Sequence, residues 1–158
     1  MIQELLAALQ ASDAAVALRK SFWVYPLVNA GHIFGLALIF GAILPLDLRL
    51  LGFRSGMDWR QLAAVLTPVA MAGVLLTLIT GLALFSARPL DYVFKPLFQI
   101  KLLFVALAIL NALLLRTTAA WQTADGTAPV PTRLKLAAII SISGWIAAIL
   151  CGRLVGYY

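Results

Sequence analysis

The sequence predicts an all-α integral membrane protein, a four-helix transmembrane bundle preceded by a short N-terminal amphipathic helix. Apolar residues make up 63% of the chain and charged residues 11%. A soluble domain is about 45–50% apolar and about 25% charged. Four apolar stretches are each long enough to cross about 30 Å of hydrocarbon, which takes about 20 helical residues. A chain of 158 residues has room for one domain, so residues 1–158 are predicted to form a single transmembrane domain.

The four predicted spans cover approximately residues 24–51, 62–85, 93–115 and 134–155. An even number of spans places both termini on one side of the membrane. Trp23, Tyr25, Tyr92, Tyr157 and Tyr158 then fall on the terminal side, and Trp59 and Trp121 fall on the opposite side. Aromatic rings of this kind prefer the headgroup level. The two aromatic belts therefore support a count of four spans.

The segment before the first span predicts a short helix that lies at the membrane surface. Its apolar residues are Leu5, Leu6, Leu9, Val16 and Leu18, a pattern that fits an amphipathic surface helix. The first basic pair, Arg19 and Lys20, follows the apolar stretch instead of preceding it, which argues against a cleavable signal peptide. A frayed polar end is the alternative interpretation.

The basic charge of the chain indicates contact with lipid headgroups. Twelve Lys and Arg residues against six Asp and Glu residues give a net charge of +6. These basic residues mostly flank apolar runs, as they do where loops meet anionic lipids. No basic stripe interleaves with aromatic residues on a polar face, so nucleic acid is not a predicted partner. The single cysteine, Cys151, excludes an internal disulfide.

Polar residues inside the spans need a reason, because an ionisable group there costs at least about 2.5–3.5 kcal/mol. His32 in the first span and Lys101 in the third lie at similar depth on the terminal side, about 12 Å from the start of their helices. Arg153 lies near the end of the fourth span on the same side, and Asn29 lies beside His32. We predict that these four residues bind a cofactor and that His32 is its metal ligand.

Other interpretations of this group stay open. With no carboxylate at that depth, porphyrin propionates, a phosphate headgroup or a quinone oxygen would each supply the missing negative charge. Arg153 and Lys101 could instead extend towards the headgroups, and His32 could simply form a hydrogen bond with a neighbouring carbonyl.

A second polar group lies on the opposite side of the membrane. It consists of Asp47, Arg49, Asn111 and Arg116. We predict that this group is structural and that Asp47 pairs with Arg49 or Arg116, since a buried charge is stable only with a partner. Two small-residue spacings, Gly31 to Gly35 and Gly152 to Gly156, predict close approach of helix backbones.

Three runs of the sequence carry a family resemblance. They are HIFGLALIFGA from His32 with LRLL from Leu48, KLLFVALAILN from Lys101, and GRLVGY from Gly152. They resemble a family of small bacterial four-helix membrane proteins. More distantly, they are similar to the membrane domain of copper resistance protein D and to the membrane-bound protoporphyrinogen oxidase of bacteria. The likeness covers nearly all four spans.

The resemblance implies a bacterial inner-membrane protein with a b-type haem held by His32, and with Lys101 and Arg153 near the haem propionates. Imidazole is a standard axial haem ligand. This chain has Asn111 where the oxidase family has a second histidine, and it contains one histidine in all. A haem would be five-coordinate, would take a weak second ligand such as Met71, or would be shared across a dimer. Oxidase activity is therefore not carried over.

Other kinds of chemistry have less support. Copper(I) prefers several thiolate, thioether or imidazole ligands, and the chain has one His, one Cys and three Met without paired spacing. Zinc prefers four nitrogen or sulfur ligands, and no catalytic triad or phosphate-binding glycine loop is present.

The sequence thus predicts a homo-oligomeric membrane protein that binds haem b or a quinone-like redox group near His32, with membrane lipids and a redox or membrane-complex partner around it. One alternative is a non-enzymatic accessory or assembly-forming protein that binds lipid headgroups. Another is a copper or proton transport component.

Overall fold

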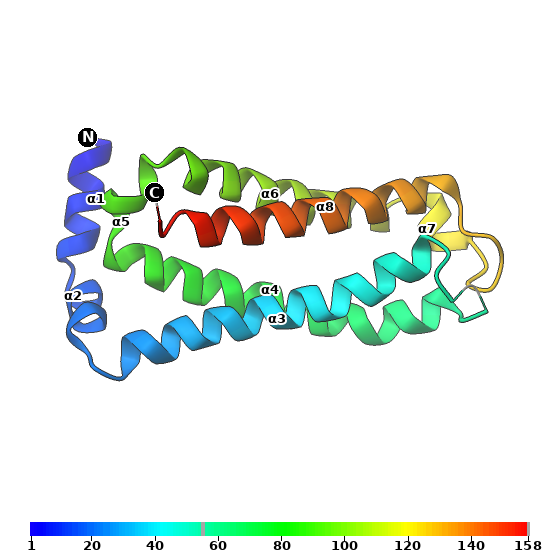
Figure 1. Ribbon diagram of the computed structural model, residues 1–158, viewed down its shortest axis with the longest axis horizontal. Coiled ribbons are helices and arrows are strands. Elements are labelled where there is room, and N and C mark those ends of the chain that lie inside the picture. Colours follow the sequence, from blue (N-terminus) through cyan, green and yellow to red (C-terminus); the bar gives the residue numbers. More distant parts are fainter. Residues whose placement is uncertain (55, 158) are drawn as a thin grey trace.

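The computed structural model describes residues 1–54 and 56–157, and every regular element within them is a helix. Four helices are long: α3 (Val24–Leu50), α4 (Trp59–Ala87), α6 (Pro96–Arg116) and α8 (Thr132–Leu154). Four are short: α1 (Ile2–Ala11), α2 (Asp13–Lys20), α5 (Pro89–Val93) and α7 (Ala119–Thr123). Figure 1 shows the long helices running side by side, with α1 and α2 across one end. The predicted all-α four-helix membrane bundle is confirmed.

The long helices expose their apolar side chains. Only 11–28% of the residues in their most apolar stretches are buried. Large side chains such as Ile33, Leu75, Leu103 and Leu150 lie on the outside of the bundle. Water is a poor solvent for such a surface, and lipid is a good one. The chain is therefore a multi-pass membrane protein with four candidate spans.

Two helix boundaries differ by three residues from the predicted spans because of local capping, and the others differ by two residues at most. α4 begins at Trp59 instead of residue 62, since the Asp58 carboxylate accepts hydrogen bonds from the amides of Arg60 (2.7 Å) and Gln61 (3.4 Å). α6 begins at Pro96 instead of residue 93. Lys95 has an extended backbone and Pro96 occupies the first helical turn, where proline is favoured.

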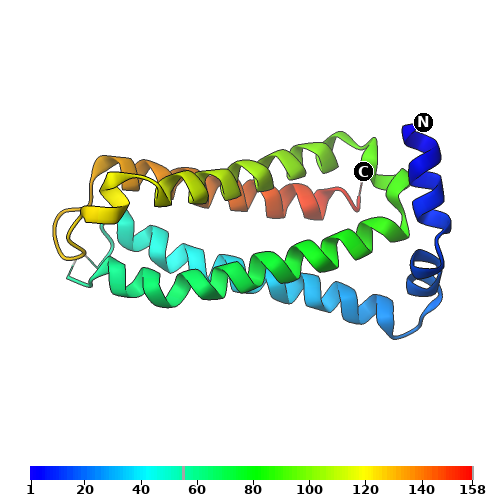
Figure 2. The same ribbon diagram turned by 180° about the vertical axis from the view of Figure 1, so that it is seen from behind.

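The N-terminal segment forms two helices where one was predicted. Ser12 separates α1 from α2, and its hydroxyl accepts a hydrogen bond from the Ala15 amide at 3.4 Å. Arg19 ties the segment to the bundle by donating hydrogen bonds to the carbonyls of Gln10 (2.9 Å) and Ala87 (2.6 Å). Both short helices lie against the end of the bundle that also holds α5 and the C-terminal part of α8 (Figure 2).

The bundle consists of two helix pairs. α3 packs on α4, α6 packs on α8, and α3 also contacts α8. Among the described residues, α4 and α6 make no close backbone contact. Figures 1 and 2 show the α3–α4 pair as one layer and the α6–α8 pair as the other. The space between α4 and α6 is therefore bounded by side chains alone.

Glycines bring α3 and α4 together. A Cβ atom on Gly35 would lie 3.1 Å from the Gly73 carbonyl oxygen, and one on Gly73 would lie 2.8 Å from the Gly35 carbonyl oxygen. Gly31 lies similarly close to Thr80. The predicted backbone approach is confirmed at Gly35, whereas Gly31 meets the side-chain methyl group of Thr80. By contrast, Gly156 follows the end of α8, and a Cβ there would meet only the carbonyl of Arg153, in its own chain segment.

The loop end of the bundle is closed by arginine side chains. Arg60 donates hydrogen bonds to the carbonyls of Ala124, Trp121 and Gln122, and Arg49 donates to those of Met57 and Gly126. Beneath them lies an apolar cluster of Leu50, Trp59, Ala63, Val130, Leu134 and Ala138. These contacts connect the α3–α4 loop to the long segment between α6 and α8.

Candidate functional site

His32 lies on α3 with its ring against α4. Its Nδ1 atom is 3.1 Å from the Thr77 carbonyl oxygen and 3.1 Å from the Thr80 hydroxyl oxygen. A Cβ atom on Gly81 would lie 3.1 Å from the imidazole Cε1, so the absence of a side chain at Gly81 makes room for the ring. The imidazole is half-buried and held at one nitrogen.

These contacts determine which ring nitrogen carries the proton. A carbonyl oxygen can only accept a hydrogen bond, so the Thr77 carbonyl requires a proton on Nδ1. The Thr80 hydroxyl uses its own proton to bond the Leu76 carbonyl at 2.6 Å, and so it also accepts from Nδ1. The Nε2 atom of a neutral imidazole then keeps its lone pair, and no hydrogen bond within the described residues uses it. This is the arrangement that metal-binding histidines commonly adopt.

Lys101 of α6 lies within electrostatic range of His32. Its aliphatic stem passes Gly152 of α8, where a Cβ atom would lie 3.3 Å from the lysine Cδ. Its ammonium group lies 5.1 Å from the centre of the Phe98 ring, and Phe98 stacks on Phe85 of α4 with 5.5 Å between ring centres. The structure thus brings a cation from α6 towards the imidazole of α3.

The other two predicted members of this site do not join it. Arg153 is exposed and donates a hydrogen bond to the Tyr157 hydroxyl at 2.7 Å, so it points along its own helix end. Asn29 is exposed on the first turns of α3. Met71, considered as a weak second ligand, lies about 9 Å along α4 from Thr77 and contacts Arg116 instead.

The polar group on the opposite side is arranged differently from our prediction. Asp47 is buried, and its hydrogen-bonding neighbour is the Ser141 hydroxyl of α8. The ion pairs of the described residues include none between Asp47 and Arg49 or Arg116. Arg49 binds loop carbonyls, as described above. Asn111 donates a hydrogen bond to the Ala137 carbonyl of α8 at 2.9 Å. Where we expected Arg49 to pair with the carboxylate, it donates hydrogen bonds to the Met57 and Gly126 carbonyls.

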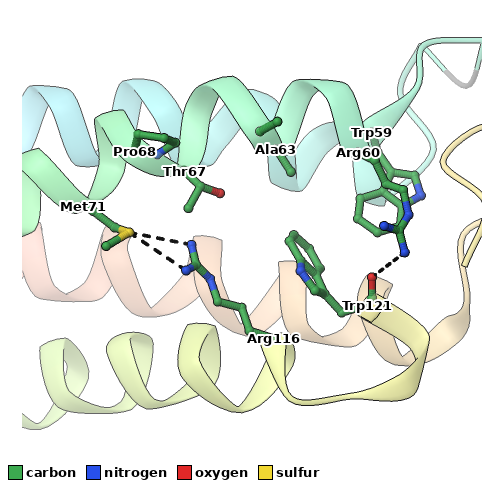
Figure 3. A pocket seen from close by; sticks show the side chains of 9 residues that line it. Trp59, Arg60, Ala63, Thr67, Pro68, Met71, Arg116 and Trp121 are labelled. Atoms are coloured by element: carbon green, nitrogen blue, oxygen red, sulfur yellow. Dashed lines mark hydrogen bonds between the residues drawn. The ribbon is translucent and has the colours of Figure 1, made fainter. Parts of the chain in front are cut away.

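Two adjoining cavities lie beside this second group, and sequence reasoning missed them. Their volumes are about 490 Å³ and about 340 Å³. We call the larger the outer cavity and the smaller the inner cavity. They share Thr67, Met71, Arg116 and Trp121. Figure 3 shows Arg116 and Trp121 pointing towards α4, where Thr67 and Met71 face them. Ser141, a polar residue in the fourth apolar run, is a further sequence signal for the inner cavity, besides Asp47, Asn111 and Arg116.

Comparison with known proteins finds no matching family model, no curated protein and no solved structure with significant similarity to this chain.

Proposed function

We propose that this membrane protein resides in a bacterial inner membrane and binds a haem b through His32. The observation that supports the proposal is the state of the imidazole. Nδ1 is engaged by the Thr77 carbonyl and the Thr80 hydroxyl, which leaves the Nε2 lone pair for an iron atom. Hydrogen bonds of this kind orient a ligating histidine and increase its basicity.

The residues present fit one strong axial ligand and one propionate contact. Nε2 of His32 would bind the iron, and the Lys101 ammonium would attract a propionate. When bound, the haem supplies one-electron redox chemistry whose potential depends on its axial ligands and on its burial. Each chain would supply one imidazole to the iron, because it has a single histidine, and a second copy in a homo-oligomer could contribute its own His32.

The chain's own contribution is binding and orientation. Thr77 and Thr80 belong to α4, while His32 belongs to α3, so the glycine contacts between these two helices also set the position of the imidazole. The apolar spans around the site exclude water, which would favour retention of an apolar macrocycle.

An absorption spectrum of the detergent-purified protein, expressed with a haem precursor, tests the proposal. We expect a Soret band in the parent protein and its loss in His32→Ala, with the variant still inserted in the membrane because Ala is apolar and a good helix former. Lys101→Leu should lower haem content without abolishing it, since a charge contact is partly replaced by water. Arg153→Gln, which alters a cation outside the site, is the matched control and should retain full haem content.

The runner-up function is that of an accessory protein that binds lipid headgroups at Lys101. It predicts the reverse order: a colourless parent protein, loss of bound anionic lipid in Lys101→Leu, and little change in His32→Ala. Native mass spectrometry of the two variants measures bound haem and bound lipid together. A parent protein without haem would refute the proposed function.

A further inference from the structure

The outer and inner cavities have the size and lining of a small-molecule site. Ligand sites commonly have volumes of about 300–1,000 Å³, apolar walls and a few convergent polar groups. These cavities, of about 490 and 340 Å³, have mostly apolar side chains in their walls. Both lie where α4 and α6 make no close backbone contact, with Arg116 and Met71 between those helices (Figure 3). A ligand could therefore enter from the lipid without any helix separating from its packing partner.

Asp47 gives the inner cavity an unsatisfied acceptor. Its side chain lines that cavity and is 6% exposed. Its Oδ2 atom has no hydrogen-bond partner among the described residues. A buried polar atom without a partner costs about 1–3 kcal/mol, so this oxygen calls for a donor. Ser141 and Asn111 line the same cavity, and the Asn111 amide group already donates to the Ala137 carbonyl.

Arg116 supplies donors to both cavities. Its two terminal nitrogens lie 3.9 and 4.0 Å from the Met71 sulfur, which is a weak acceptor. No ion pair within the described residues involves this guanidinium. The site therefore combines unused donors on Arg116 with an unused acceptor on Asp47, inside walls that suit an apolar body.

The donors on Arg116 and the acceptor on Asp47 together indicate which ligand headgroup the cavities would bind. A phosphate would satisfy Arg116 but would bring negative charge towards Asp47. A neutral headgroup that both accepts and donates hydrogen bonds satisfies the two residues together, and the apolar walls and lipid-facing opening require the rest of the ligand to be apolar. We propose that the cavities bind a lipid-soluble quinol. One of its hydroxyl groups donates to Asp47 Oδ2, an oxygen accepts from Arg116, and its tail leaves between α4 and α6. The proposal concerns binding alone and does not depend on haem at His32.

Quenching of tryptophan fluorescence in lipid nanodiscs tests it, because Trp59, Trp121 and Trp145 line the cavities. The probe is a benzoquinone with a decyl tail, and its reduced quinol is the competitor. We expect saturable quenching by the quinone and displacement by the quinol at about tenfold lower concentration, the effect of one added hydrogen bond to Asp47. Asp47→Asn should remove that preference, because its amide group donates to a quinone oxygen.

A steric pair of variants provides the control. Ala112 lines the inner cavity, whereas Ala106, also exposed on α6, lines neither cavity. Ala112→Phe should abolish saturable quenching and Ala106→Phe should leave it unchanged. Equal quenching in both variants would overturn the site. Absence of saturable quenching in the parent, with phosphatidylglycerol retained through Arg116 in native mass spectra, would instead identify an anionic lipid as the occupant. Neither result bears on the Soret band of the His32 site.

Discussion

The two ends of the bundle are both held together by side chains that donate hydrogen bonds to backbone carbonyls, but the loop end has more of these bonds than the terminal end. At the loop end, Arg49 and Arg60 donate hydrogen bonds to five backbone carbonyls across the chain, above a buried cluster that contains Trp59 and Leu134. At the terminal end, Arg19 bridges the carbonyls of Gln10 and Ala87, and Lys95 donates to the Val155 carbonyl at 3.1 Å. The loop end is the firmer scaffold, and it supports the cavities. The candidate haem ligand lies towards the looser end.

The difference shows how a small membrane bundle can hold two helix pairs together through glycine contacts and arginine–carbonyl hydrogen bonds. Apolar packing against lipid gives little net attraction between helices. Close glycine contacts act in the middle, and arginine–carbonyl hydrogen bonds act at the interface, where water and headgroups lower the cost of a charge.

Among the variants that test this comparison of the two ends, Gly126→Ala should cause the largest loss of folding stability. An added Cβ would lie 1.8 Å from the Asp58 Oδ1 atom, so the carboxylate that caps α4 would have to move. The change would also disturb the 3.2 Å hydrogen bond from the Trp59 amide to the Gly126 carbonyl. We expect a loss of about 3 kcal/mol, from overpacking and a weakened cap. Thermal unfolding in detergent measures it. Gly56→Ala, where a Cβ would meet nothing within 4 Å, is the control, and an equal loss there would contradict this account.

The next effect should come from Gly35→Ala in the middle of the bundle. Its Cβ would lie 3.0 Å from the Thr77 amide nitrogen and 3.1 Å from the Gly73 carbonyl oxygen. Backbone atoms cannot rotate away, so α3 and α4 must separate at a cost of about 2 kcal/mol.

Gly41→Ala on the same helix provides a control with the opposite sign. A Cβ there meets nothing within 4 Å, and Ala is favoured over Gly in a helix by up to about 1 kcal/mol. If the unfolding temperature falls in both Gly35→Ala and Gly41→Ala, the loss of stability does not come from the close contact of α3 with α4 at Gly35.

Replacing the arginine at each end should cause smaller losses of stability, and the loss should be larger at the loop end. Arg60→Met removes donors from three carbonyls and Arg19→Met from two, while both variants keep much of the apolar stem. We expect a loss of about 2 kcal/mol for Arg60→Met and about 1 kcal/mol for Arg19→Met. Limited proteolysis should cleave the segment at 122–131 faster in Arg60→Met only. Equal protection of that segment in both variants would place the stability of the loop end elsewhere.

Composition predicted the spans because the free energy of transferring a helix into lipid depends mainly on the residues of that helix. The boundaries at Trp59 and Pro96 depend on single capping residues, and the break at Ser12 on one hydroxyl, so hydropathy alone could not locate them. The contact of His32 with the Thr77 carbonyl and the divergence of α4 from α6 are tertiary features. Neither feature can be predicted from the hydrophobic periodicity of a single helix. The hydrogen bond from Arg153 to Tyr157, a residue just beyond the end of α8, is likewise not indicated by hydropathy.

The smallest expected effect on stability is that of Asp47→Asn. An ion pair with Arg49 or Arg116 would make this change costly, at about 3–5 kcal/mol. The structure instead gives Asp47 the Ser141 hydroxyl as its neighbour and leaves Oδ2 without a partner. Asn has the same shape, can still accept from Ser141, and brings no buried charge. We therefore expect a change below about 1 kcal/mol, measured by thermal unfolding without added quinol. Asp47→Leu should cost more, since it leaves the Ser141 hydroxyl without its acceptor. If the Asn variant is as unstable as the Leu variant, the stability lost in both must come from the charge of Asp47, which both variants lack. That result would indicate that Asp47 forms an ion pair.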